Sequence, residues 1–208
     1  MNIINVKSSI DYDVIIGRGL LGNAGELISK KLSPNRAVII TDDVVDNLYG
    51  SLIENSLRVS GIPSSKYVFP NGEQSKNIGT LENILEFLAQ NGVTRSDLII
   101  AFGGGVVGDI AGFAAACYMR GIDYVQIPTT FLAAIDSSVG GKTAVDLKAG
   151  KNLAGAFHQP RLVICDPDTL KTLTPDIFAD GAAEAIKYGV LASEHLFNML
   201  KTGLFNDK

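Results

Sequence analysis

The sequence has little of what a secreted or nucleic-acid-binding protein needs. Its 208 residues include only two cysteines, and 18 Lys and Arg against 22 Asp and Glu give a net charge of −4. A nucleic-acid surface requires a basic face, so we expect no such partner. Cys117 and Cys165 lie among apolar residues. We therefore expect reduced thiols in a cytoplasmic protein rather than a disulfide.

Targeting segments and long hydrophobic runs are also absent. The N-terminus has no basic stretch followed by an apolar one, so we expect no signal peptide. The most apolar segment, residues 98–117, is interrupted by glycines and by Asp109, which argues against a membrane-spanning helix. Because 46% of the residues are hydrophobic, the chain can bury a proper core. We expect no membrane partner.

Short apolar runs alternate with longer amphipathic segments along the first 170 residues. We predict strands at residues 14–16, 37–41, 66–69, 98–102, 124–127 and 162–165, and helices at 24–32, 48–60, 78–90 and 107–119. This alternation predicts an α/β fold with a parallel, Rossmann-like sheet flanked by helices.

The pattern changes near Lys171. Thr174 and Pro175 are typical of a helix start, with a capping threonine followed by proline at the first helical position. No strand pattern follows them. We therefore predict an α/β domain over residues 1–170 and the first helices of a second, all-helical domain over residues 171–208.

A glycine-rich turn follows the predicted strand at 98–102. Residues 103–109 match the pattern G-x-G-x-x-G, in which glycines let a pyrophosphate approach the backbone at a helix N-terminus. The usual acidic ribose ligand is missing after the next strand. Asp42, at the end of the second predicted strand, is the candidate for that role. The alternative is a tight turn with close helix–sheet packing.

Residues 128–152 form a long polar segment. It holds three lysines, two aspartates and the pair Gly140-Gly141, and it has no apolar period long enough for a buried element. We predict a functional loop suited to phosphate or carboxylate groups, the alternative being a solvated surface loop. A second polar turn, residues 71–76, also follows a predicted strand and precedes a helix, as ligand-binding turns in α/β sheets do. The alternative, which the residues alone favour, is a turn that caps the helix through Ser75 and pairs its charges in solvent.

Asp180, Glu184 and Lys187 share one face of the predicted helix after Thr174. Glu184 is a candidate metal ligand, the alternative being an intrahelical pair with Lys187. His195 lies eleven residues further on, about 16 Å along a helix, and is too distant for the same metal. We interpret His158 as a residue that anchors a loop.

Several of these segments together resemble the 3-dehydroquinate synthase family. They are residues 71–76, 103–109, 128–152, 155–160 and 181–188. The resemblance extends along the chain from about Val14. It implies a homodimeric lyase of the shikimate pathway that depends on NAD and on Zn²⁺ or Co²⁺. Its substrate would be an anionic sugar phosphate, 3-deoxy-D-arabino-heptulosonate 7-phosphate, and its products 3-dehydroquinate and phosphate.

The resemblance also implies site residues. The substrate would be met by Arg120, Asp136, Lys142, Asn152 and Lys187, and the metal by Glu184. NAD would be held by Asp42, Asn71, Gly72, Glu73, Gln74, Ser75, Lys76, Gly105, Val106, Val107, Gly108, Asp109, Thr129, Thr130, Lys142, Lys151, Thr169, Leu170, Lys171 and Thr172.

Two histidine ligands that the family places in its helical domain have no counterpart in this sequence. We therefore expect a truncated enzyme that binds NAD weakly and does not turn over. Three alternatives stay open: a related sugar-phosphate cyclase, an oxidoreductase similar to glycerol dehydrogenase, and a non-catalytic NAD-binding module.

Overall fold

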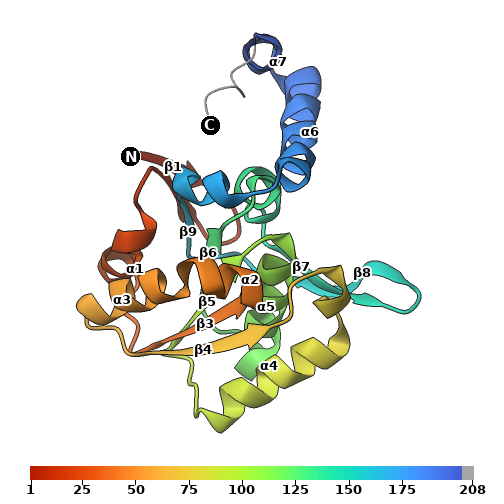
Figure 1. The fold of residues 1–208 in the computed structure, drawn as a ribbon. Helices are drawn as coiled ribbons and strands as arrows, with labels where there is room; N and C mark the ends of the chain where they lie inside the picture. Colours follow the sequence, from red (N-terminus) through yellow and green to blue (C-terminus); the bar gives the residue numbers. More distant parts are fainter. Residues whose placement is uncertain (203–208) are drawn as a thin grey trace.

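A computed structural model of the chain describes residues 1–202. Its centre is a seven-stranded sheet in the order β1-β2-β9-β6-β5-β3-β4 (Figure 1). The strands are β1 (Asn2–Val6), β2 (Tyr12–Ile16), β3 (Ala37–Asp42), β4 (Ser64–Phe69), β5 (Leu98–Gly103), β6 (Tyr124–Pro128) and β9 (Leu162–Cys165). Only the β1–β2 pair among these is antiparallel. The predicted parallel α/β sheet is confirmed, while strand β1 was not predicted.

Helices cover both faces of the sheet. One face carries α1 (Ala24–Lys31) and α3 (Ser51–Val59), and the other carries α4 (Ile78–Gln90) and α5 (Gly105–Cys117). Shorter turns complete the connections: η1 (Leu21–Asn23), α2 (Asp43–Val45), η2 (Asp46–Gly50), η3 (Glu73–Ser75), η4 (Tyr118–Arg120) and η6 (Pro167–Thr172). The predicted helices are confirmed, except that residues 48–50 belong to the π-turn η2.

The central strands are buried on both faces, as parallel strands between two helical layers must be. Every residue of β3 and of β5 is buried. Ile39 and Phe102 pack beneath α1 and α3, whereas Ile40 and Ile99 pack beneath α4 and α5. Burying one such side chain contributes about 1.5–3 kcal/mol.

Residues 128–152 do not form the loop that the sequence predicts. They contain the π-turn η5 (Ala133–Ser137) and the strand β7 (Lys142–Leu147), which pairs with β8 (Gly150–Phe157) as an antiparallel hairpin. Thr143 and Val145 face inward on β7, and this short alternation was the missed signal. The hairpin packs closely on α5, since a Cβ at Gly112 would lie 2.5 Å from the Cγ2 of Thr143.

Helix α6 (Pro175–Ala192) and helix α7 (Glu194–Lys201) extend beyond the sheet (Figure 1). The side chain of Thr174 caps α6 by accepting from the backbone N–H of Ile177, so the predicted helix start is confirmed. The division into two domains stays a prediction, and residues 203–208 of its second part lie outside the described residues. Across residues 1–202, none of the helices has the length and apolar character needed to cross a membrane.

The connections that follow β3 and β5 run over opposite faces of the sheet. β3 continues into α3 on one face, and β5 continues into α5 on the other. Because the two strands are neighbours, their carboxyl ends flank a topological switch point, where open α/β sheets bind ligands.

Candidate functional site

A cleft opens at the carboxyl ends of β3 and β5; we call it the β3/β5 cleft. Its wall includes many of the residues predicted to hold a cofactor, together with residues at the start of α6. The predicted residues that line it are Asp42, Asn71, Gly72, Gly105, Val106, Thr129, Thr130 and Thr172. The structure thus brings predicted residues from five separate segments together in one cleft.

The N-terminus of α5 forms the floor of this cleft. Gly104 is the N-cap in an extended conformation and offers no capping side chain, so the first N–H groups of α5 stay available. A Cβ at Gly104 would lie 3.0 Å from Thr130, and one at Gly105 would lie 3.2 Å from Ser137. Side chains here would crowd the wall, and glycine keeps it open for a ligand.

Val107 and Gly108 lie lower in this turn. Val107 is almost fully buried beneath Gly103, and a Cβ at Gly108 would meet Gln126 at 2.7 Å. The structure therefore does not bring the side chain of Val107 to the cleft.

Asp42 stands at the end of β3, as predicted. It is buried, and its Oδ1 accepts a hydrogen bond from the backbone N–H of Val45 at 2.9 Å. The neighbouring Asp43 accepts from the backbone N–H of Asn71 at 2.8 Å. The first bond caps the short helix after β3, and the second ties that helix to the turn at residues 71–76.

The predicted residues of η6 divide into two groups. The hydroxyl of Tyr49 bonds to Oγ1 of Thr172 at 2.7 Å, and this bond holds Thr172 at the cleft. Thr169 is buried beneath it. Lys171 instead pairs with Asp168 at 2.7 Å, and neither Lys171 nor Leu170 lines the cleft.

A buried polar network links the turn at residues 71–76, helix α5 and residue 152. Nζ of Lys76 is 2.5 Å from Oδ2 of Asp109 and 2.6 Å from Oδ1 of Asn152. Burial raises the pKa of Asp109, and the attraction of Lys76 offsets only part of that shift. Three predicted residues that are distant in sequence therefore meet in one network.

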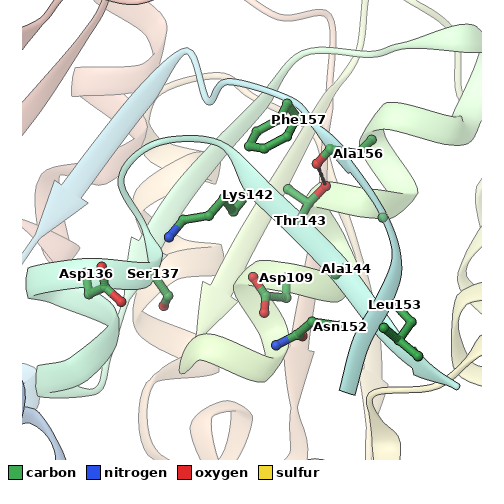
Figure 2. A pocket seen from close by; sticks show the side chains of 11 residues that line it. Asp109, Asp136, Ser137, Lys142, Thr143, Ala144, Asn152, Leu153, Ala156 and Phe157 are labelled. Atoms are coloured by element: carbon green, nitrogen blue, oxygen red, sulfur yellow. Dashed lines mark hydrogen bonds between the residues drawn. The ribbon is translucent and has the colours of Figure 1, made fainter. Parts of the chain in front are cut away.

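A second cavity, of about 540 Å³, lies between α5, η5 and the β7–β8 hairpin; we call it the hairpin cavity. Among its lining residues are the predicted Asp109, Asp136, Lys142 and Asn152 (Figure 2). Figure 2 shows Lys142 extending toward Asp136 and Ser137, with Asn152 near Asp109. A cation, carboxylates and an amide around one space suit a polyhydroxylated anion.

Two features of this cavity were not predicted. Asn152 adopts a positive φ of 57°, a strained conformation of the kind that collects at functional sites. Leu153 and Phe157 supply an apolar rim, and Phe157 is 82% exposed. No sequence pattern identified the exposed side chains of β8, because residues 128–152 were interpreted as a loop.

Helix α6 reaches the hairpin cavity through Tyr188. Its hydroxyl donates to Oδ1 of Asp136 at 2.9 Å. This bond is the main reason that the pKa of Tyr188 is raised to about 12. The sequence analysis assigned Tyr188 no role.

Glu184 pairs with Lys187 on α6 at 2.5 Å, and the Lys187 side chain is 55% exposed whereas that of Glu184 is 17% exposed. This is the alternative that the sequence analysis left open. Residues 1–202 contain no group of three His, Cys, Asp or Glu side chains that could hold a metal ion. A metal role for Glu184 stays a prediction. His158 anchors its loop, because its Nε2 lies 2.9 Å from the carbonyl of Ile122 and its ring stacks on Tyr124.

Some predicted residues lie away from both spaces. Arg120 is exposed and follows the C-terminal end of α5, roughly 20 Å along the helix from the glycine turn. It lines neither the β3/β5 cleft nor the hairpin cavity.

The turn residues Glu73, Gln74 and Ser75 bond mainly within their own surroundings. Glu73 pairs with Lys151 at 2.8 Å in an exposed position. Gln74 donates to the carbonyl of Asn71 at 2.7 Å, and Ser75 donates to the carbonyl of Pro70. These residues shape the rim of the site and do not line either space.

The chain is similar to known proteins along most of its length. It is 51% identical over 190 residues to the 3-dehydroquinate synthase of Clostridium acetobutylicum, which covers 91% of this chain and 53% of that protein. The chain thus spans about half the length of the curated relatives it matches.

Two solved structures share the fold. The first is 2-epi-5-epi-valiolone synthase from Streptomyces hygroscopicus subsp. jinggangensis with NAD⁺ and Zn²⁺ bound. It has a TM-score of 0.86 at 32% identity, over 96% of this chain and 55% of that one. The second is 2-deoxy-scyllo-inosose synthase complexed with carbaglucose-6-phosphate, NAD⁺ and Co²⁺. It has a TM-score of 0.83 at 30% identity, over 89% of this chain and 50% of that one.

A family model described as 3-dehydroquinate synthase N-terminal matches residues 66–180, which is more than half of the chain. This match includes the glycine turn, η5, the hairpin and the start of α6. The chain therefore belongs to the 3-dehydroquinate synthase family.

Proposed function

We propose that this chain supplies the cofactor-binding part of a 3-dehydroquinate synthase. The reaction is the NAD- and metal-dependent conversion of 3-deoxy-D-arabino-heptulosonate 7-phosphate to 3-dehydroquinate and phosphate, a carbon–oxygen lyase step in the shikimate pathway. The observation that carries this proposal is that α5 links the two spaces: Gly105 lines the β3/β5 cleft, and Asp109, four residues further along α5, lines the hairpin cavity and bonds to Lys76.

The β3/β5 cleft suits a dinucleotide. The free N–H groups at the start of α5 would bind the pyrophosphate, and the carboxylate of Asp42 would accept from a ribose hydroxyl. NAD, when bound, supplies a reversible hydride acceptor. Lys76 and Asp109 would position the nicotinamide end beside the hairpin cavity, since Asp109 lines that cavity and bonds to Lys76.

The hairpin cavity suits a sugar phosphate. Lys142 would pair with the phosphate or the carboxylate, while Asp136 and Asn152 would hold sugar hydroxyls. As phosphate leaves, negative charge grows on its oxygens. The ammonium group of Lys142, which lines the cavity from the start of β7, would stabilise that charge.

The described residues do not fit a metal site by themselves. Glu184 is one candidate ligand, and further ligands would have to come from outside residues 1–202. We therefore derive no step through a metal. We propose Glu184 as one metal ligand. Lys187, which pairs with Glu184 in this structure, would then face the substrate. Arg120 and a homodimer remain proposals that rest on the family.

A related sugar-phosphate cyclase is the second candidate. The two solved structures at 30–32% identity carry other synthase names, one of them is complexed with carbaglucose-6-phosphate, and both share the fold of this chain. Binding assays against several sugar phosphates would separate the two candidates. Stronger binding of a sugar phosphate that lacks the carboxylate would favour the second one.

Calorimetric titration of the 208-residue chain with NAD⁺ tests the cofactor site. The variant Gly104→Val keeps an allowed backbone, at φ −77°, but places a side chain against Thr130 in the cleft. We expect it to weaken NAD⁺ binding at least about tenfold, since the pyrophosphate loses its approach to α5. Gly22→Ala is the matched control, because its Cβ makes only an ordinary contact at 3.9 Å from Leu52.

Two results would contradict the proposal. One is a wild-type chain that shows no NAD⁺ binding. The other is equal affinity in the wild-type chain and Gly104→Val. Formation of dehydroquinate by the purified chain, free of host enzyme, would contradict the expectation that further metal ligands are needed.

A further inference from the structure

Helix α6 presents one face to the segment that carries Asp136. The ring of Phe178 stacks on Phe131 with centroids 5.0 Å apart. A Cβ at Gly181 would lie 2.7 Å from the backbone nitrogen of Leu132, so the two backbones approach closely at this point. Ala185 is buried on the same side. The spacing of three, four and three residues from Phe178 through Ala185 to position 188 follows a single helical face.

The next residue along that face is Tyr188, and its side chain reaches the wall of the hairpin cavity at Asp136. Its phenol donates to Oδ1 of Asp136 at 2.9 Å across 52 residues of sequence. Asp136 itself lines the cavity. The bond uses one carboxylate oxygen, so the other oxygen can accept from a ligand hydroxyl.

Lys142 lies in the same cavity and points toward Asp136 (Figure 2). Within residues 1–202, however, Lys142 forms no salt bridge. A carboxylate and an ammonium group in one cavity attract each other, and an ion pair between them would neutralise the cation that an anionic ligand needs. The hydrogen bond from Tyr188 holds the carboxylate on the α6 side instead.

We propose that Tyr188 is a positioning residue that holds Asp136 at the wall of the hairpin cavity and keeps it from pairing with Lys142. The inference rests on the proposed function, because it assigns the cavity to the sugar phosphate. The phenol of Tyr188 is the donor in the bond to Asp136, since an ionised carboxylate only accepts. Its role is to orient Asp136, without contact to the reacting atoms.

A double-mutant cycle with Tyr188→Phe and Asp136→Ala tests the proposal. Binding of 3-deoxy-D-arabino-heptulosonate 7-phosphate to the 208-residue chain is measured by calorimetry with NAD⁺ at saturation. Loss of one hydrogen bond to a charged group corresponds to at least about a tenfold weaker affinity for Tyr188→Phe. In the Asp136→Ala background the same change should have less than about a twofold effect, because the residue it positions is gone. NAD⁺ affinity should not change.

Tyr118→Phe is the matched control. Its hydroxyl donates to the carbonyl of Val93 at 3.0 Å, outside the site, and its loss should leave both affinities unchanged. If Tyr188→Phe weakens sugar-phosphate binding equally in both backgrounds, Tyr188 acts through packing alone and the proposal is wrong. An unchanged affinity in Tyr188→Phe would also overturn it.

A second measurement needs no ligand. The same four proteins are unfolded in urea, and we expect the unfolding equilibrium constants to depart from independence by about threefold or more. If the wild-type chain does not bind the sugar phosphate, the proposed function fails. The unfolding cycle still decides whether Tyr188 holds Asp136, and multiplicative effects would show that it does not.

Discussion

Strand β5 has a buried ion pair at each end, and the two pairs differ in how completely the protein satisfies them. At the amino end, Arg36 lies 3.0 Å from Asp97, whose side chain is 4% exposed. Just beyond the carboxyl end, Lys76 lies 2.5 Å from Asp109, whose side chain is 18% exposed. Both carboxylates are removed from water. The pKa of Asp97 is nevertheless lowered, whereas that of Asp109 is raised.

The number of hydrogen-bond donors explains the difference. At Asp97, burial alone would raise the pKa, but the backbone N–H and the hydroxyl of Thr94 and the guanidinium of Arg36 together outweigh it. At Asp109, burial outweighs its single partner, Lys76. Thr94 and Arg36 satisfy the carboxylate of Asp97 with hydrogen bonds from within the protein. The carboxylate of Asp109, which lines the hairpin cavity, is left short of donors, as functional carboxylates often are.

The largest effect that we predict comes from breaking the satisfied pair. Asp97→Ala leaves the Arg36 guanidinium and the Thr94 N–H without their partner. We expect the free energy of unfolding to fall by about 3 kcal/mol, the lower end of the range for a broken buried pair, because Arg36 keeps some exposure. Urea unfolding followed by circular dichroism measures it. NAD⁺ affinity of the folded protein should not change.

Asp123→Ala provides the control for this measurement. Asp123 pairs with Arg161 at 3.3 Å, with side chains 49% and 36% exposed, and such surface pairs contribute less than about 1 kcal/mol. A loss of similar size in both variants would mean that Asp97 is no better satisfied than a surface carboxylate.

Breaking the unsatisfied pair should produce the opposite signature. Asp109→Asn keeps the shape of the side chain and removes a charge that burial disfavours, while Lys76 keeps its bond to Asn152. We expect unfolding to change by less than about 1 kcal/mol, because the two effects offset each other. NAD⁺ affinity should fall about tenfold, since a charged acceptor at the site is lost. Calorimetry and urea unfolding measure the two quantities on the same samples.

Asp123→Asn is the isosteric control, and it should change neither quantity. If Asp109→Asn destabilises the chain as much as Asp97→Ala does and leaves NAD⁺ binding intact, the difference between the two pairs has no functional meaning.

Local patterns predicted the sheet and its helices because each element had its own signal. The buried strand β5 is apolar throughout, and Thr174 with Pro175 marks the start of α6. The β7–β8 hairpin was missed because only two residues of β7 face inward, and one of them, Thr143, is polar. Single-sequence patterns are weak for such short alternations.

The site was predicted mainly by the resemblance, and contacts between distant segments were beyond local patterns. Lys76 meets Asp109 across 33 residues and Asn152 across 76, separations that no periodicity encodes. The bond from Tyr188 to Asp136 depends on how α6 packs on η5. Arg120 was predicted for the substrate, yet this chain holds it past the end of α5.

The smallest effect that we predict is a difference in the pH dependence of stability. Asp97 has a lowered folded pKa. Its contribution is therefore present above the unfolded value, about 3.9, and is lost as the pH falls through the lowered value. Asp109 has a raised folded pKa. Its contribution is therefore present below about 3.9 and is lost as the pH rises through the raised value.

The two carboxylates therefore act in opposite directions as the solution is acidified, and their isosteric variants separate them. Asp97→Asn should flatten the fall in unfolding free energy below about pH 4, because one group that resists protonation in the folded state is gone. Asp109→Asn should remove the gain in stability that appears as the pH falls through the raised pKa of Asp109, so acid loss begins from a lower plateau. Each unit of pKa difference corresponds to about 1.4 kcal/mol. Urea unfolding of the three proteins from pH 3 to 7 measures both slopes. If both variants changed the slope in the same direction, Asp97 and Asp109 would be equivalent structural carboxylates, and the contrast between the two ends of β5 would not hold.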